Sequence, residues 1–243
     1  YARRMGVEVV PVPLKDDLTI DLDGMAAAVT DEVSLVYICN PNNPTGHTLD
    51  GDKLRDFCRS VGPRAVVVID EAYIELTDRP DYTSMIDLVR DGENVIVMRT
   101  FSKLFGMAGM RVGYGIGRPD IAGQIAEHVM AWPNGVGLAA AKACYTDDEF
   151  IEFSRSKIFE GRDMVVDTFR KNGIEPQPSQ TNFVFANIGR NGSEFQLQMA
   201  ERKILIRGRY AQCPDYIRVS MGKIEDIETV QTVFTDVFRG RHG

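Results

Sequence analysis

The sequence has no apolar run long enough to cross a bilayer, and no secretory hydrophobic segment follows its N-terminus. Its longest apolar runs, such as Ala65 to Ile69, have only the length of a strand. Cysteine is scarce, because the chain has four and none of them forms a Cys-x-x-Cys pair. We therefore predict no membrane segment, no disulfide framework and no metal site. The cysteines are expected to be small buried side chains in a reducing, cytoplasmic compartment.

Basic residues are also in the minority, and this excludes one class of partner. The 28 lysines and arginines against 35 aspartates and glutamates give a net charge of −7, which offers no reason to expect nucleic acid as a partner. Hydrophobic residues make up 44% of the chain and charged residues 26%, as in ordinary globular proteins. A length of 243 residues favours one or two domains. His47, His128 and His242 match no catalytic motif, so packing or surface roles are expected for all three.

Three apolar runs share one plan, because each ends abruptly in polar residues that can do chemistry. The runs are Leu35 to Cys39, Ala65 to Ile69 and Asn94 to Met98. The polar segments after them are Asn40-Pro-Asn-Asn-Pro-Thr-Gly46, Asp70-Glu-Ala-Tyr73 and Thr100-Phe-Ser-Lys103. Helical patterns lie between the runs, at Asp50 to Gly62 and Thr83 to Arg90. Strands that alternate with helices predict right-handed crossovers and a largely parallel sheet. Asn43, Asp70 and Lys103 should then meet at one edge of that sheet.

Lys103 is the residue in these segments whose chemistry most needs an explanation. It follows a strand pattern, has hydroxyls nearby at Thr100 and Ser102, and precedes Arg111 by eight residues. Its amine is suited to forming a Schiff base while the hydroxyls and the arginine hold an anionic group beside it. A lone lysine in a loop is more often an ordinary surface residue, but the flanking pattern favours the chemical interpretation.

The rest of the chain predicts a second, α+β unit. Val112 to Gly117 is expected to form a strand and Pro119 to Met130 a helix, after which Trp132 to Gly137 interrupts the pattern. A long helix is predicted from Asp147 to Asn172, as a bridge between domains. Strands are then expected at Thr181 to Phe185, Ile204 to Ile206 and Tyr216 to Ser220, with helices at Ser193 to Arg202 and around Ile227 to Phe238. At the front, Tyr1 to Gly6 is interpreted as part of a helix that leads into a strand at Val7 to Val10, so we expect the chain to begin in the middle of a domain.

With these motifs in hand, the chain resembles the fold type I, pyridoxal-phosphate-dependent aminotransferases, most closely the histidinol-phosphate aminotransferase branch. The three polar segments, Arg111 and Ile217-Arg-Val-Ser220 occur in the family's order. The resemblance implies an α/β fold with a cofactor-binding large domain at residues 1–145. A smaller α+β domain, led by the long helix, is implied at residues 146–243. The family's N-terminal segment, which contributes to cofactor binding, has no counterpart before Tyr1, so the N-terminal part of the family fold is expected to be absent.

The resemblance also assigns the cofactor contacts. Lys103 would form the Schiff base with pyridoxal 5'-phosphate and then move the proton at the substrate α-carbon. Asp70 would pair with the pyridine nitrogen, although a helix N-cap is the plainer role for an aspartate after a strand. Tyr73 and Asn43 would donate to the phenolic oxygen, and Asn43 can serve equally in turn formation. Arg111 would bind the phosphate, with hydroxyls from Ser102 and Thr100.

Three further residues are implied to bind substrate. Arg218 would grip the α-carboxylate, against the alternative of a strand arginine that faces solvent. Arg207 would bind a distal phosphate, but Arg209 competes for that role and an exposed charge at a strand end is equally compatible. Asn182 would line the site.

The implied activity is transfer of an amino group between an amino acid, or a phosphate ester such as histidinol phosphate, and a 2-oxo acid. As in the family's enzymes of amino-acid biosynthesis, the chain would act on small molecules as a homodimer. The sequence leaves three alternatives open: a decarboxylase of a phosphorylated amino acid, an inactive fragment and a sensor domain. The sensor reading requires a DNA-binding helix-turn-helix, and neither end of this chain supplies one.

Overall fold

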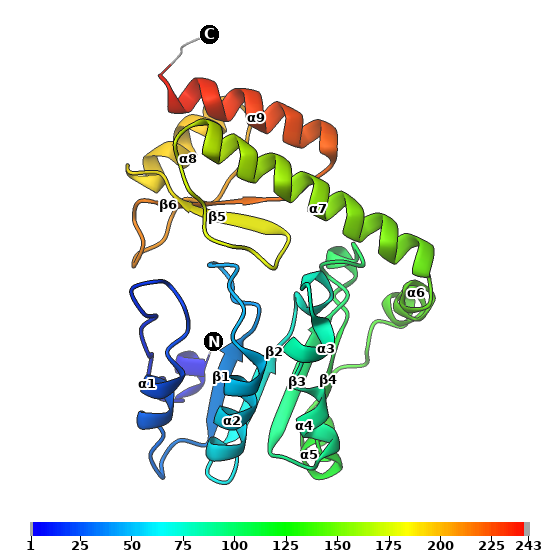
Figure 1. Ribbon diagram of the computed structural model, residues 1–243. Helices are drawn as coiled ribbons and strands as arrows, with labels where there is room; N and C mark the ends of the chain where they lie inside the picture. Colours follow the sequence, from blue (N-terminus) through cyan, green and yellow to red (C-terminus); the bar gives the residue numbers. More distant parts are fainter. Residues whose placement is uncertain (1, 241–243) are drawn as a thin grey trace.

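Two β-sheets organise the chain, for which a computed structural model describes residues 2–240. The predictions for Tyr1 and His242 lie outside these residues. The first sheet contains β1 (Leu35–Cys39), β2 (Val66–Asp70), β3 (Val95–Thr100) and β4 (Gly113–Ile116), in that order. The first three strands are parallel and β4 pairs with β3 in the antiparallel direction. The largely parallel sheet predicted from the three apolar runs is therefore confirmed (Figure 1).

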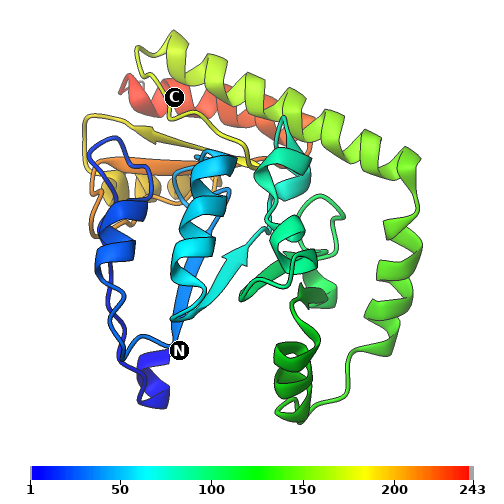
Figure 2. The same ribbon diagram turned by 60° about the horizontal axis from the view of Figure 1, so that its bottom comes forward.

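One face of this sheet carries the main apolar core. α1 (Leu22–Ala27) and α2 (Gly51–Val61) lie side by side over it (Figures 1 and 2). The first turn of α2 is capped by Asp50, whose carboxylate accepts a hydrogen bond from the amide of Lys53 at 3.0 Å. Residues at helical spacing on α2 then pack against the strand residues that point to the same side, such as Ile38 and Val67.

The opposite face of the sheet is much more open. Alternate strand residues point to this side, and among them Leu35 is 54% exposed, Tyr37 52% and Met98 43%. An apolar residue at the edge of a core is ordinary, but three on one face mark a surface that the described residues do not cover.

The remaining elements of the first half surround the sheet. They are η1 (Ala2–Met5), η2 (Ile74–Leu76), α3 (Pro80–Thr83), α4 (Ile86–Arg90), η3 (Ala108–Met110), α5 (Pro119–Glu127) and α6 (Gly135–Tyr145). Of the helices among residues 2–240, none combines the length and the apolar character that a membrane span requires.

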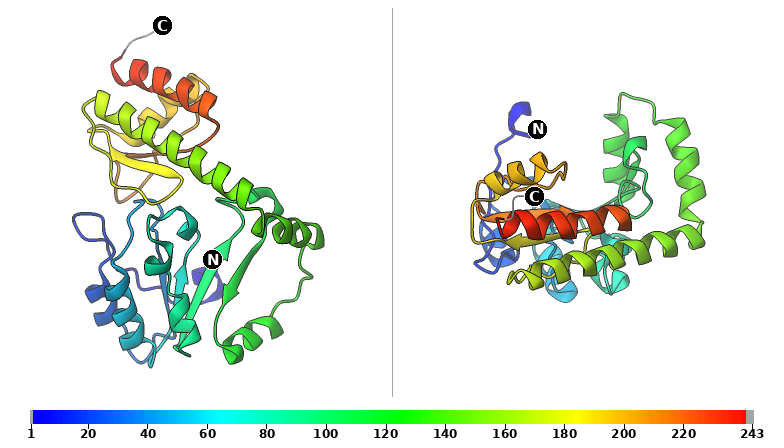
Figure 3. Two further views of the ribbon diagram at one scale, coloured as in Figure 1. Left: turned by 45° about the vertical axis from the view of Figure 1, so that its right-hand side comes forward. Right: turned by 90° about the horizontal axis from the view of Figure 1, so that it is seen from above.

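The second half folds around an antiparallel pair, β5 (Phe183–Asn187) and β6 (Tyr216–Ser220). α7 (Asp148–Lys171) and α9 (Ile224–Phe238) lie side by side above this pair, with α8 (Gly192–Glu201) beside them (Figure 3). Three phenylalanines from the three helices, Phe169, Phe195 and Phe234, meet edge to face in the core at centroid distances of 5.1–5.2 Å. α7 also packs against the first half, so the division at residue 145 stays a prediction.

Four details differ from the sequence prediction. Residues Val7 to Val10 form no strand, because no described strand lies beside them to pair with, and the segment before them is a short 3-10 helix. Ile204 to Ile206 forms no strand either, and only Arg207 makes a bridge to Arg218. The helix expected at Thr83 to Arg90 is broken at Ser84 into α3 and α4. The helix α6 was not predicted, since its glycines and the preceding Trp-Pro resemble a loop.

A buried ion pair between Glu71 and Arg99 attaches the loop that follows β2 to the strand β3. The side chain of Glu71 is fully buried and its Oε2 accepts two hydrogen bonds from Arg99, at 2.9 and 3.0 Å. Ser84 donates to the same oxygen at 2.9 Å, and the amide of Met85 donates to Oε1 at 2.7 Å. Burial raises the pKa of Glu71, whereas the amide of Met85 and then the charge of Arg99 oppose that rise. The whole network must be present for the carboxylate to be tolerated.

We predict that Arg99→Met destabilises the fold by about 3–5 kcal/mol, because removal of one partner leaves a buried charge uncompensated. Urea unfolding followed by circular dichroism measures this loss. Arg170→Met is the control, since Arg170 pairs with Glu175 on the surface and its loss should leave the unfolding midpoint unchanged. Equal midpoints for wild type and Arg99→Met would contradict the structural role of the network.

Candidate active site

The carboxyl ends of β1, β2 and β3 lie at one edge of the first sheet, and the polar segments leave from there. Asn43 follows β1, Asp70 is the last residue of β2, and Lys103 comes three residues after β3. Parallel pairing in register forces these ends together, since Cys39 lies opposite Asp70 and Asp70 opposite Met98. β6 approaches the same edge through Arg218, whose Nη1 donates to Oδ1 of Asn43 at 2.6 Å.

Lys103 lies half-buried in the loop between β3 and β4. Its Nζ is 5.1 Å from the centre of the Tyr73 ring. Burial lowers the pKa of Lys103, and the positive charge of Arg218 lowers it further, while Asp70 opposes both. A larger share of the amine is therefore neutral, and able to act as a nucleophile or base, than in a surface lysine.

Both carboxylate oxygens of Asp70 have donors. Oδ1 accepts from the amide of Ala72 at 3.1 Å, and Oδ2 accepts from the hydroxyl of Tyr37 at 2.5 Å. The local contact resembles a turn rather than a helix N-cap, because the 3-10 helix that follows begins only at Ile74. The capping alternative for Asp70 therefore finds no support in the structure.

Tyr73 and Arg218 pack against one aromatic side chain. The ring of Tyr73 meets Phe183 edge to face at 5.4 Å, and the guanidinium carbon of Arg218 lies 4.8 Å from the centre of the same ring. Burial raises the pKa of Tyr73 to about 12, so its hydroxyl is a donor at neutral pH. The Nε of Arg218 is buried and has no hydrogen-bond partner within residues 2–240. A buried guanidinium nitrogen of this kind is a position at which an anionic ligand would be stabilised.

Of the predicted anion-binding residues, Thr100 ends β3, and Ser102 and Arg111 lie between β3 and β4. Thr100 Oγ1 accepts a hydrogen bond from the amide of Ser102 at 3.1 Å, which shapes the start of the lysine loop. Arg111 is exposed, adopts a left-handed conformation with φ of 57°, and donates from Nη1 to the carbonyl of Ala108 at 2.8 Å. A left-handed arginine is uncommon and marks a backbone that the surrounding loop constrains.

Arg207 lies directly opposite Arg218, because the two residues exchange backbone hydrogen bonds of 3.1 and 2.6 Å. Residues that face each other in this way project to the same side of a sheet. Arg207 is exposed, with its guanidinium carbon 5.9 Å from the centre of the Tyr210 ring. Arg209 is also exposed. Asn182, the third predicted substrate-binding residue, accepts a hydrogen bond at its backbone carbonyl from the amide of Met221 at 2.9 Å.

Sequence reasoning missed Tyr37, which the structure joins to Asp70. The signal was the alternation of side chains along a strand. Tyr37 lies two residues before Cys39, which is opposite Asp70, so the side chains of Tyr37 and Asp70 are on the same face of the sheet. His47 and His128 make ordinary polar contacts. Nε2 of His47 lies 3.0 Å from Oε1 of Gln177, and Nδ1 of His128 lies 2.7 Å from the carbonyl oxygen of Gln124. No cluster of three or more possible metal-binding side chains occurs in the described part of the chain.

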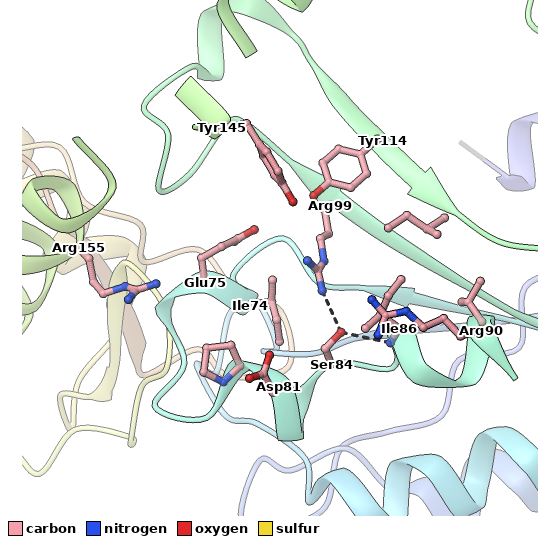
Figure 4. A pocket seen from close by; sticks show the side chains of 13 residues that line it. Ile74, Glu75, Asp81, Ser84, Ile86, Arg90, Arg99, Tyr114, Tyr145 and Arg155 are labelled. Atoms are coloured by element: carbon pink, nitrogen blue, oxygen red, sulfur yellow. Dashed lines mark hydrogen bonds between the residues drawn. The ribbon is translucent and has the colours of Figure 1, made fainter. Parts of the chain in front are cut away.

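Apart from this edge, a pocket of about 660 Å³ is lined by residues of η2, α3, α4, β3 and β4, together with one residue each from α6 and α7 (Figure 4). Glu75, Arg99, Tyr145 and Arg155 point into it from different elements. Burial raises the pKa of the Glu75 carboxyl to about 7, and the nearby charges of Arg99 and Arg155 only partly oppose this.

The fold should lose stability as the pH rises toward the pKa of the Glu75 carboxyl. Its pKa in the folded chain lies above the ordinary value of 4.5, so the stabilising neutral form is fully present at low pH and is lost as the pH approaches 7. Glu75→Gln should therefore remove up to about 3 kcal/mol of the stability difference between pH 5 and pH 8. Urea unfolding at both values measures it, with the exposed Glu228→Gln as control. Identical pH profiles for Glu75→Gln and wild type would show that Glu75 titrates normally.

Comparison with known proteins assigns this chain to a family. Residues 1–234 match the family model described as aminotransferase class I and II. A histidinol-phosphate aminotransferase of Brevibacillus brevis is 33% identical over 97% of this chain, and an aromatic amino acid aminotransferase of Mycobacteroides abscessus is 40% identical over 90%. The chain spans 65% and 62% of the lengths of these two relatives.

Solved structures agree with the sequence relatives. The histidinol-phosphate aminotransferase of Sinorhizobium meliloti, determined in complex with pyridoxal-5'-phosphate, superposes with a TM-score of 0.90 at 30% identity. The match covers 99% of this chain and 67% of that structure. The enzyme of Clostridium acetobutylicum gives a TM-score of 0.91 at 26% identity, over 98% of this chain and 74% of that one. The chain therefore has part of the α/β aminotransferase fold and belongs to the aminotransferase class I and II family, with histidinol-phosphate aminotransferases among its near relatives.

Proposed function

We propose that this chain is the lysine-bearing part of a pyridoxal-phosphate-dependent aminotransferase. It would move an amino group between an amino acid, or a phosphate ester such as histidinol phosphate, and a 2-oxo acid. The observation that carries the proposal is the meeting of Lys103, Asp70 and Arg218 at one sheet edge. This set of side chains fits the cofactor: an amine of lowered pKa, a carboxylate with fixed oxygens, and a guanidinium with a buried nitrogen that has no partner among the described residues.

Lys103 and Asp70 would carry the reaction chemistry. Pyridoxal phosphate, when bound, supplies an electron sink for the negative charge that develops at the substrate α-carbon. Lys103 would hold the cofactor covalently and then take and return the proton at the α-carbon, a task for which its lowered pKa suits it. Asp70 would keep the ring nitrogen protonated. Tyr73, a donor at neutral pH, would hydrogen-bond the ring's phenolic oxygen together with the amide of Asn43.

Two groups of residues would hold the anionic ends of the ligands. Arg111, with hydroxyls from Ser102 and Thr100, would bind the cofactor phosphate, since a guanidinium fork matches a phosphate dianion. Arg218 would bind the substrate α-carboxylate, and its hydrogen bond to Asn43 would set the orientation of the fork. Arg207, on the same side of the sheet as Arg218, would reach a distal phosphate, and Asn182 would line the site.

We further propose that the working enzyme is a cytoplasmic homodimer. The segment before α6 supports a partner surface, because Met130 is 100% exposed and Trp132 97%. Decarboxylation of a phosphorylated amino acid remains the alternative reaction. The L-threonine-O-3-phosphate decarboxylase of Porphyromonas gingivalis is only 20% identical to this chain, so the similarity supports the fold and not the reaction. Product analysis separates the two reactions, because only decarboxylation releases carbon dioxide.

We expect pyridoxal phosphate to attach to Lys103 and to no other lysine. Only this lysine combines the strand-end position with the lowered pKa and the nearby Arg111. Borohydride reduction followed by peptide mass mapping locates the attachment. Lys103→Arg should remove the label, whereas Lys157→Arg, at an exposed position on α7, should leave it in place. Label on Lys142 or Lys157 in the wild type would refute the assignment.

The substrate class can be tested through Arg207. If it binds a distal phosphate, Arg207→Ala should weaken histidinol phosphate by roughly ten- to a hundredfold, the loss of one charge-assisted hydrogen bond of about 1.5–3 kcal/mol. It should barely affect phenylalanine, while Arg218→Ala should weaken both alike. Arg209→Ala tests the competing assignment in the same way, and kcat/KM is the measurement. An unchanged preference in both Arg207→Ala and Arg209→Ala would favour a general aromatic or aliphatic aminotransferase.

A further inference from the structure

We propose that Tyr37 is a positioning residue: its hydroxyl holds the carboxylate of Asp70 in the orientation that the cofactor's ring nitrogen requires. The proposal rests on the proposed function, because it gives Asp70 the ring nitrogen as its partner. Three observations carry it: the short contact between the two side chains, their placement on the sheet, and the hydrogen bonds on both carboxylate oxygens.

The contact is a charge-assisted hydrogen bond at the short end of its range. Tyr37 Oη donates to Asp70 Oδ2 at 2.5 Å. The pairing register explains how the side chains meet, since Tyr37 lies opposite Val68 and Asp70 lies two residues further along β2 on the same face. The length of a tyrosine covers that diagonal, so the ring runs along the open face and the hydroxyl arrives at the edge where the strands end.

The two oxygens of Asp70 are therefore fixed from different directions. The amide of Ala72 holds Oδ1 at 3.1 Å, and Tyr37 holds Oδ2. A planar group held at both oxygens cannot turn about its last bond without breaking one contact. Each oxygen keeps a second lone pair, so Oδ2 can accept a proton donor in addition to Tyr37.

The hydroxyl would also strengthen the ion pair proposed for Asp70. A hydrogen bond donated to a carboxylate stabilises its charged form relative to its neutral form. The ring nitrogen of bound pyridoxal phosphate would therefore keep its proton more readily with this bond than without it. Tyr37 is suited to the task because partial burial, and then its bond to Asp70, raise the pKa of its phenol further above physiological pH, so that it remains a donor.

The plainer alternative is that Tyr37 only covers an open strand face, where aromatic residues are common. A tyrosine in that role is replaceable by phenylalanine without effect on Asp70. The chain offers a control, since Tyr82 donates to Asp50 Oδ2 at 2.8 Å and to Asp52 Oδ2 at 3.5 Å, none of which belongs to the candidate site. Tyr37→Phe and Tyr82→Phe each remove one hydroxyl that donates to aspartate, and circular dichroism tests whether both variants fold.

The first measurement uses pyridoxal phosphate labelled with ¹⁵N in its ring, bound to the full chain. We expect the ¹⁵N resonance of wild type and Tyr82→Phe to lie at the protonated end of its range, and that of Tyr37→Phe to move toward the neutral pyridine value. The cofactor's dissociation constant should also rise roughly tenfold in Tyr37→Phe, as expected for loss of a hydrogen bond to a charged group. A resonance and an affinity unchanged from wild type would overturn the proposal.

The second measurement needs no cofactor and separates this proposal from the proposed function. In protein labelled with ¹³C at tyrosine Cζ, Asp70→Ala should move the Tyr37 resonance upfield and leave Tyr82 in place, and Asp50→Ala should do the reverse. A Tyr37 resonance that does not respond to Asp70→Ala would overturn the contact itself. If the contact is present but the wild-type chain binds no pyridoxal phosphate, the proposed function fails, and the role of Tyr37 falls with it.

Discussion

Parallel pairing of β1, β2 and β3 is the constraint from which the candidate site follows. Parallel strands run in the same direction, so everything that leaves their carboxyl ends starts from one edge of the sheet. Asn43, Asp70 and Lys103 are distant in sequence, and their proximity requires no attraction between them. The core beneath the sheet supplies the energy, because the burial of residues such as Ile38 and Val67 stabilises the pairing that places the polar groups.

Much of this arrangement could be predicted from the sequence, because it depends on local patterns. The apolar runs can be recognised by their composition and length. The helix after Asp50 and the helix that ends at Lys171 each have a period and a capping residue that can be recognised without a structure. Once strands and helices alternate, the direction of the strands follows from the handedness of the crossovers. The sequence alone therefore predicts that the lysine loop lies beside Asp70.

The remainder depends on contacts between distant segments, for which one sequence holds no local signal. The bond between Arg218 and Asn43 joins residues 175 apart, and only the packing of the second sheet over the first creates it. Tyr37 was overlooked because a tyrosine in a strand is ordinary until its neighbour across the sheet is known. Val7 to Val10 has the composition of a strand, but a strand also needs a partner, and no described segment provides one.

The long helix α7 belongs to two cores at once. Its first half contributes Ile158 to the cluster around the lysine loop, and its second half contributes Val165 and Phe169 to the core under β5 and β6. Gly161 lies buried between them, close to the side chains of Met221 and Ile227. One continuous helix therefore couples the unfolding of the two halves. Melting either core would fray the element that the other depends on, so the two halves should unfold in a single transition.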